Sequence, residues 1–132
     1  MKAVRQESVE RAGPSWPARL LRATAEARGK RQSVTCLLDD AAEVNVISQS
    51  TALRCNLVKV DVPLPDMEGF RGEKGACYGA YKLRMRIADS TGAERVTDDV
   101  FFAVDLSGAE VLLGRPWRRK YGIVVDSRND YW

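Results

Sequence analysis

Apolar and polar residues alternate along several short stretches of the chain. From Leu21 to Arg28, apolar residues occupy every second position and polar or charged residues fill the others. A period of two residues indicates a strand with one solvated face, whereas Ser15, Pro17 and Gly29 would suit the limits of a helix. Because the alternation is strict, we interpret residues 18–28 as a strand.

Further strands and two short helices are predicted from the same kind of pattern. A period of two returns at residues 81–88, with a turn at 89–92, and Gly122 suits the end of a helix at 117–121. A second helix is expected at 49–55. The expected strands are 18–28, 33–38, 43–48, 58–62, 81–88, 96–104, 111–114 and 123–125. Many short strands with one or two short helices predict a small, mostly antiparallel β fold.

The length and charge of the chain predict one domain behind a basic leader. At 132 residues the chain suits a single core. Residues 1–35 carry a net charge of +5, and the remainder carries −2. We therefore expect a basic, flexible leader at residues 1–17 and one domain at 18–132. The sequence contains neither a transmembrane-length apolar run nor a secretory signal, so we expect an intracellular, cytoplasmic protein without membrane contact.

The residue types that are missing restrict the chemistry. The chain has no histidine, which excludes Ser-His-Asp and Cys-His nucleophile systems and most catalytic zinc sites. Its three cysteines are far apart and form no Cys-x-x-Cys pair, so we expect reduced thiols and no metal. Carboxylates must then carry any acid-base chemistry, and no cofactor is expected.

Two separated motifs carry a resemblance to a known family. Residues 37–48 read LLDDAAEVNVIS, and residues 111–117 read VLLGRPW. The first resembles the active-site stretch of retropepsin-like aspartic proteases, especially those of long-terminal-repeat retrotransposons. The second resembles that family's other signature, two apolar residues and Gly-Arg before a short helix. The resemblance implies a retropepsin-like acid protease fold, which is a small, closed β-barrel-like domain that forms homodimers.

The resemblance also implies a catalytic residue, Asp39. Peptide hydrolysis needs a base that activates water and an acid that protonates the leaving nitrogen, and two carboxylates sharing one proton supply both. The chain has one such motif, so its Asp39 would pair with the Asp39 of a second copy across a two-fold axis. By resemblance, Glu43 would bind the substrate backbone and pair with Arg115, which together with Gly114 would brace the loop.

The active-site loop, residues 40–43, departs from the family pattern. Asp40 stands where the family has Ser or Thr, and it adds negative charge beside the dyad. Ala41 stands where the family has Gly, so a methyl group could strain the loop or block the site. Ala42 and Glu43 complete the loop. These departures leave open a catalytically inactive retropepsin-like domain that binds a partner or holds a dimer.

A glycine-rich segment at residues 69–79 lies where the family has its flap, the lid over the substrate. Its central residues are Gly72, Glu73, Lys74 and Gly75. The same tetrad matches the GXXG loop of RNA-binding KH domains, but strands rather than helices are expected on both sides of it. We therefore expect a second copy of the chain and a polypeptide substrate as partners, with nucleic acid disfavoured. The predicted function is an aspartic endopeptidase, and the weakest alternative is a nucleic-acid adaptor using the basic leader.

Overall fold

A computed structural model of the chain describes residues 20–39, 41–66, 76–89, 91–122, 124–125 and 130–131. The expected leader, residues 1–17, lies outside these residues. The strands are β1 (Leu20–Ala27), β2 (Lys30–Leu38), β3 (Val46–Ser48), β4 (Val58–Val60), β5 (Gly79–Ala88), β6 (Glu94–Val104), β7 (Val111–Leu113), β8 (Val124–Val125) and β9 (Asp130–Tyr131). The helices in the described part are α2 (Gln49–Arg54) and α3 (Arg115–Tyr121).

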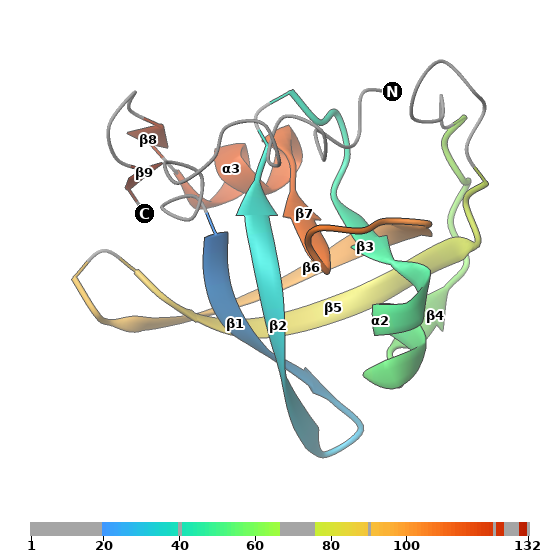
Figure 1. Cartoon of the computed structure of the whole chain (residues 1–132), viewed down its shortest axis with the longest axis horizontal. Coiled ribbons are helices and arrows are strands. Elements are labelled where there is room, and N and C mark those ends of the chain that lie inside the picture. The colour runs from blue at the N-terminus through green and yellow to red at the C-terminus, as the bar shows by residue number, and fades with distance from the viewer. Residues whose placement is uncertain are drawn as a thin grey trace.

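The main sheet closes into a six-strand barrel (Figure 1). Its strands follow one another in the order β1-β2-β7-β3-β6-β5, and β5 pairs with β1 to close the circle. Strand β4 pairs with residues 80–82 of β5, on the same edge that β1 occupies at residues 84–87. The pairs β2–β7 and β3–β6 are parallel, and the other pairs are antiparallel. The predicted small, closed, mostly antiparallel β fold with one or two short helices is confirmed, and the described residues contain two.

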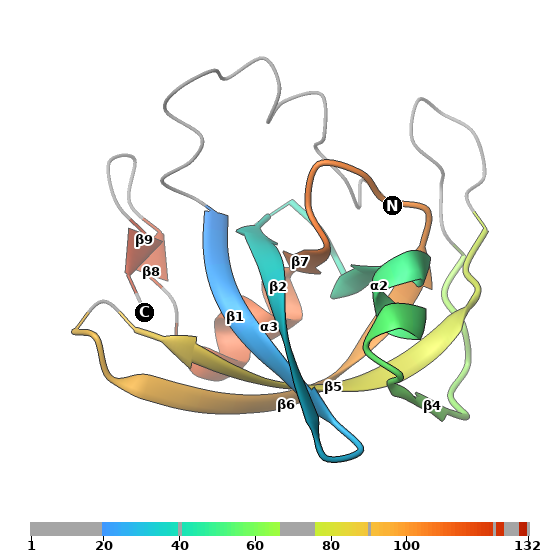
Figure 2. The same cartoon turned by 60° about the horizontal axis from the view of Figure 1, so that its bottom comes forward.

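Two hairpins form most of the barrel wall. Strands β1 and β2 meet in a turn at Arg28 and Gly29, which both have positive φ, 52° and 76°. Such a two-residue turn matches the right-handed twist of its strands. Strands β5 and β6 pair from Gly79–Ala103 to Ala88–Glu94 and cross behind the first hairpin (Figures 1 and 2). The strand expected at 18–28 is present as β1, and its alanines point inward.

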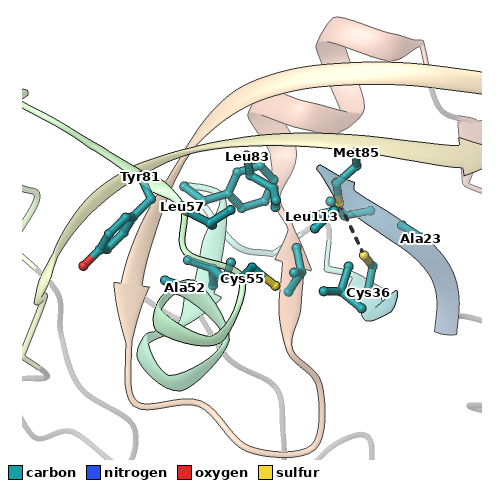
Figure 3. Close-up of a cluster of buried hydrophobic side chains, with 14 of the residues drawn as sticks. Ala23, Cys36, Ala52, Cys55, Leu57, Tyr81, Leu83, Met85 and Leu113 are labelled. Atoms are coloured by element: carbon teal, nitrogen blue, oxygen red, sulfur yellow. Dashed lines mark hydrogen bonds between the residues drawn. The ribbon is translucent and has the colours of Figure 1, made fainter. Parts of the chain in front are cut away.

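The alternating residues of the hairpins form the main core (Figure 3). Leu83, Met85 and Ile87 on β5 are buried, and they pack with alternate residues of β1 and β2. Cys36 is fully buried there, with its Sγ 3.8 Å from Met85 Sδ, and burial raises the pKa of its thiol far above the ordinary range. Cys36 is therefore a small core residue.

Both helices begin and end at residues suited to those positions. Ser48 precedes α2, and its Oγ accepts a hydrogen bond from the Thr51 backbone N–H at 3.1 Å. Helix α3 follows Gly114, buries Trp117 completely, and ends at Gly122 with φ of 67°. Neither helix of the described part is long and apolar enough to cross a membrane.

Candidate active site

Asp39 directly follows β2 and lies in the protein interior. Its backbone N–H donates to Leu113 O at 3.0 Å, which extends the parallel pairing of β2 with β7 by one residue. The residue is 4% exposed. Because side chains alternate along a strand, Asp39 lies on the same face as Leu37 and opposite the face of Leu38, which belongs to the main core. The end of strand β2 in the barrel therefore fixes the position of this carboxylate.

The residues after Asp39 turn tightly around its carboxylate. Ala41 N–H donates to Asp39 Oδ1 at 3.0 Å, and Ala42 N–H donates to Asp39 O at 3.1 Å. Ala41 therefore takes part in this turn through its backbone N–H. Asp40 lies outside the described residues.

Gly114 allows β7 to approach this loop closely. A Cβ atom on Gly114 would overlap the Val44 carbonyl oxygen and would lie 2.9 Å from Val44 C and 3.0 Å from Ala42 O. Contacts this close to backbone atoms exclude every other residue type unless the loop moves. Arg115 N–H then donates to Ala42 O at 2.9 Å. Gly114 and Arg115 therefore hold the Asp39 loop mainly through the backbone.

Asn45 is a positioning residue that sequence reasoning missed. It is 7% exposed, and its Oδ1 accepts a hydrogen bond from Gly114 N–H at 3.1 Å. Its backbone oxygen accepts from Phe102 N–H at 3.0 Å, so it joins the loop to β7 and β6. The sequence does mark Asn45 as unusual, because it is the single polar residue inside the apolar run Val44–Ile47. Nothing in one sequence specifies the partner of that amide.

We expect Asn45→Ala to destabilise the fold by about 1–3 kcal/mol, because it leaves the buried Gly114 N–H without its acceptor. Chemical denaturation would measure the loss. The control Ser50→Ala removes an exposed polar side chain from helix α2 and should lose less. Equal stability of Asn45→Ala and the wild type would contradict the assigned role.

Glu43 and Arg115 are close enough for the expected ion pair. Arg115 Nη2 lies 3.7 Å from Glu43 Oε1, with the two side chains 38% and 68% exposed. An ion pair this solvated contributes less than about 1 kcal/mol. The backbone bond from Arg115 to Ala42 therefore does more to hold the loop than the side-chain pair, which leaves the Glu43 carboxylate accessible to a ligand.

Glu110 forms a second polar centre, at the start of β7. Its Oε1 accepts from Thr35 N–H at 3.0 Å and from Thr35 Oγ1 at 3.3 Å. Its Oε2 accepts from Thr51 Oγ1 at 3.3 Å and from Arg54. Partial burial acts to raise the pKa of Glu110, but the Thr35 N–H and the Arg54 guanidinium outweigh burial and lower it. This carboxylate ties β2 and α2 to β7, and no pattern along the chain indicates it.

We expect Glu110→Gln to lower the free energy of unfolding at pH 7 by about 1–2 kcal/mol, since hydrogen bonds to a charged group are lost. The pKa of Glu110 is lower in the folded state than the ordinary value of 4.5, so its contribution is present above that pH and is lost as pH falls through the folded pKa. The difference between variant and wild type should therefore shrink in acid. Glu94→Gln, at a more exposed carboxylate paired with Arg86, is the control and should show a smaller difference at pH 7.

A second apolar cluster covers the Asp39 face of the sheet. Its buried members are Leu37, Val46, Val104 and Leu112, and partly buried Val44, Cys77, Leu106 and Ala109 pack against them. These residues come from β2, β3, β6 and β7 and from the loops beside them. The cluster is separate from the main core. Asp39 thus lies on a sheet face that carries a partly exposed apolar surface.

Solved structures of two proteases or protease-like domains resemble this fold. One is the retroviral protease-like domain of Ddi1 from Leishmania major, with a TM-score of 0.54 and 17% identity over 82% of this chain and 83% of that chain. The chain has a retropepsin-like fold. The other is the EIAV protease complexed with the inhibitor HBY-793, with a TM-score of 0.52 and 15% identity over 81% of this chain and 90% of that chain. No family profile matches the sequence, and no curated protein matches it.

The predicted site residues of this retropepsin-like domain fall into two groups. Asp39, Ala41, Ala42, Glu43, Gly114 and Arg115 come together around the loop between β2 and β3. Asp40 and the flap residues Gly72, Glu73, Lys74 and Gly75 lie outside the described residues. Within the described ranges, no group of three or more His, Cys, Asp or Glu side chains could hold a metal ion.

Proposed function

We propose that the protein is a homodimeric aspartic endopeptidase of the retropepsin type. Asp39 and the Asp39 of a second copy form the catalytic dyad. One carboxylate takes a proton from water as the water attacks the peptide carbonyl, and the protonated carboxyl of the pair delivers a proton to the leaving nitrogen. Two carboxylates at about 3 Å cannot both ionise, so the dyad titrates as a unit with two apparent pKa values.

The observation that carries this proposal is the placement of Asp39. The residue is 4% exposed at the end of a barrel strand, and its loop is held to β7 by close backbone packing at Gly114. Rigid placement of this kind is what a catalytic carboxylate requires. One chain supplies one such aspartate, so the two-carboxylate chemistry requires a second copy.

The apolar cluster beside Asp39 supports a preference for apolar substrate side chains. Its partly buried members Val44, Leu106 and Ala109 pack against a cluster that includes Leu37, which shares a strand face with Asp39. Burying substrate methylene groups there would contribute about 0.8 kcal/mol for each group. We therefore expect cleavage next to apolar residues, with Glu43 binding the substrate backbone and the flap residues 72–75 closing over the peptide.

The proposal is tested by incubating the protein with an unstructured polypeptide between pH 4 and pH 7. We expect cleavage that a transition-state mimic of peptide hydrolysis inhibits. Because the dyad needs two copies, specific activity should fall when the protein is diluted below the concentration at which sedimentation shows dimers. A monomer that remains fully active would contradict the dyad.

A second candidate function is favoured by one feature of the sequence. Asp40 and Ala41 replace the residues usual in this motif, which is consistent with an inactive domain that holds a dimer or binds a protein partner. A stable dimer with no inhibitor-sensitive cleavage would support that interpretation. Cleavage gained on Ala41→Gly would identify position 41 as the cause of the inactivity.

The remaining expectations rest on the sequence. We propose that the protein is related to proteases of the long-terminal-repeat retrotransposon type, works inside the cell, and carries residues 1–17 as a leader separate from the domain at 18–132. Neither a cofactor nor a metal enters the proposed chemistry.

A further inference from the structure

A shallow basic pocket lies at the turn between β1 and β2. It has a volume of about 380 Å³ and is lined by Glu26, Ala27, Arg28, Gly29, Lys30, Arg31 and Arg84. The turn is at the opposite end of the hairpin from Asp39 (Figure 2). At about 3.3 Å per residue, β2 separates the two by roughly 30 Å. The pocket is therefore distinct from the candidate active site.

The positive charge of the pocket exceeds what its one carboxylate can neutralise. Glu26 is 19% exposed and already lies 3.5 Å from Arg31 and 3.9 Å from Arg84, and it also binds Arg86. Arg84 also lies 3.9 Å from Asp98, and Arg86 lies 3.0 Å from Glu94, but neither of those carboxylates lines the pocket. The side chains of Arg31 and Arg84 remain 66% and 51% exposed, so at least half of each still faces solvent. The pocket can accept further anionic groups.

Two more cations are presented by the turn itself. Arg28 Nε donates to Asn56 O at 2.9 Å, which anchors the guanidinium against the end of helix α2. Lys30 is exposed, and it forms no ion pair with any residue that the structure describes. The turn residues Arg28 and Gly29 fix the backbone between these side chains. A ligand would therefore meet a largely preformed group of cations.

We propose that this basic pocket, residues 26–31 with Arg84, is a docking site for an acidic segment of a polypeptide. Carboxylates match the planar fork of arginine, which can donate two parallel hydrogen bonds. Single-stranded nucleic acid binds to grooves that add aromatic side chains for base stacking, and no aromatic residue lines the pocket. An acidic peptide needs only the cations that are present. The site does not depend on the proposed peptidase activity.

The test measures binding of a fluorescent peptide of about eight glutamates to the full chain at about 20 mM salt, where screening is weak. The double variant Lys30→Gln with Arg31→Gln should bind roughly tenfold more weakly, since two charge pairs are lost. The matched control, Lys59→Gln with Arg119→Gln, removes the same charge outside the pocket and should change affinity less than about twofold.

Several outcomes would overturn the proposal. These are no binding of the glutamate peptide, an equal loss in both double variants, or tighter binding of an oligothymidylate that depends on the same two residues. Thermal unfolding would check that the double variant folds. If it does not, Lys30→Glu serves in its place, because Lys30 is exposed and its replacement leaves the pairs of Glu26 intact. That variant should also bind the peptide more weakly than wild type, and unchanged affinity would reject the site.

Discussion

Asp39→Asn should reduce the turnover number for peptide cleavage by at least about a thousandfold, because an amide cannot take the proton from the attacking water. The fold should persist. Asparagine has the same shape, and its Oδ1 still accepts the hydrogen bond from Ala41 N–H. Since the substitution removes a carboxylate that is 4% exposed, stability should stay the same or rise. Steady-state kinetics and thermal unfolding on one preparation would measure both effects.

Asp61→Asn is the matched control, because it removes an exposed carboxylate on the segment after β4 and should leave cleavage unchanged. Mixing the Asp39→Asn variant with wild type tests directly whether two copies share the active site. Excess Asp39→Asn protein added to wild type should suppress cleavage, since mixed dimers contain only one aspartate of the dyad. Full activity of Asp39→Asn would refute the proposed mechanism, and undiminished activity in the mixture would refute the shared site.

Gly114→Ala should destabilise the protein by about 3 kcal/mol or more, an effect at the upper end for overpacking. The new methyl group would collide with the Val44 carbonyl and press on Ala42 O, and neither backbone group is free to move alone. Any relief must shift the loop that carries Asp39. Cleavage should therefore fall even where the variant remains folded, and denaturation with urea together with an activity assay would separate the two losses.

Gly92→Ala provides the control for this prediction. Gly92 has φ of 85°, and a Cβ atom added there would have no neighbouring atom within 4 Å, so alanine meets only the left-handed backbone cost of about 1–2 kcal/mol. The activity of the Gly92→Ala variant, calculated per folded molecule, should match that of wild type. A Gly114→Ala variant at least as stable as Gly92→Ala would contradict the close packing of Gly114 against the loop.

Much of the local structure could be predicted from the chain because it depends on neighbouring residues. The alternation that starts at Leu21 predicts β1, and burial of Ala23 and Ala25 agrees with it. Ser48 and Gly122 mark the start of α2 and the end of α3 through bonds or backbone angles within a few residues. Such signals survive in a single sequence, since each involves residues close along the chain.

The order of strands in the barrel required the tertiary structure. Residues 111–113 enter between β2 and β3, parallel to one and antiparallel to the other. Nothing in a run of three apolar residues selects those neighbours, because a short apolar strand fits any buried position in a sheet. The same holds for Asn45 and Glu110, whose partners Gly114, Thr35 and Arg54 lie more than fifty positions away along the chain.

The amino-acid sequence alone determined the residue types that could do chemistry: an aspartate at the end of an apolar strand, a Gly-Arg pair before a short helix, and no histidine. Only the folded chain decided how they meet. The missing Cβ of Gly114 lets β7 lie against the loop of Asp39, and Arg31, Arg84 and Arg86 gather around Glu26. The physical reason is that strand pairing and close backbone packing join segments that are distant along the chain. The energies of these contacts depend on shape and distance in space, not on which residues are neighbours in the sequence.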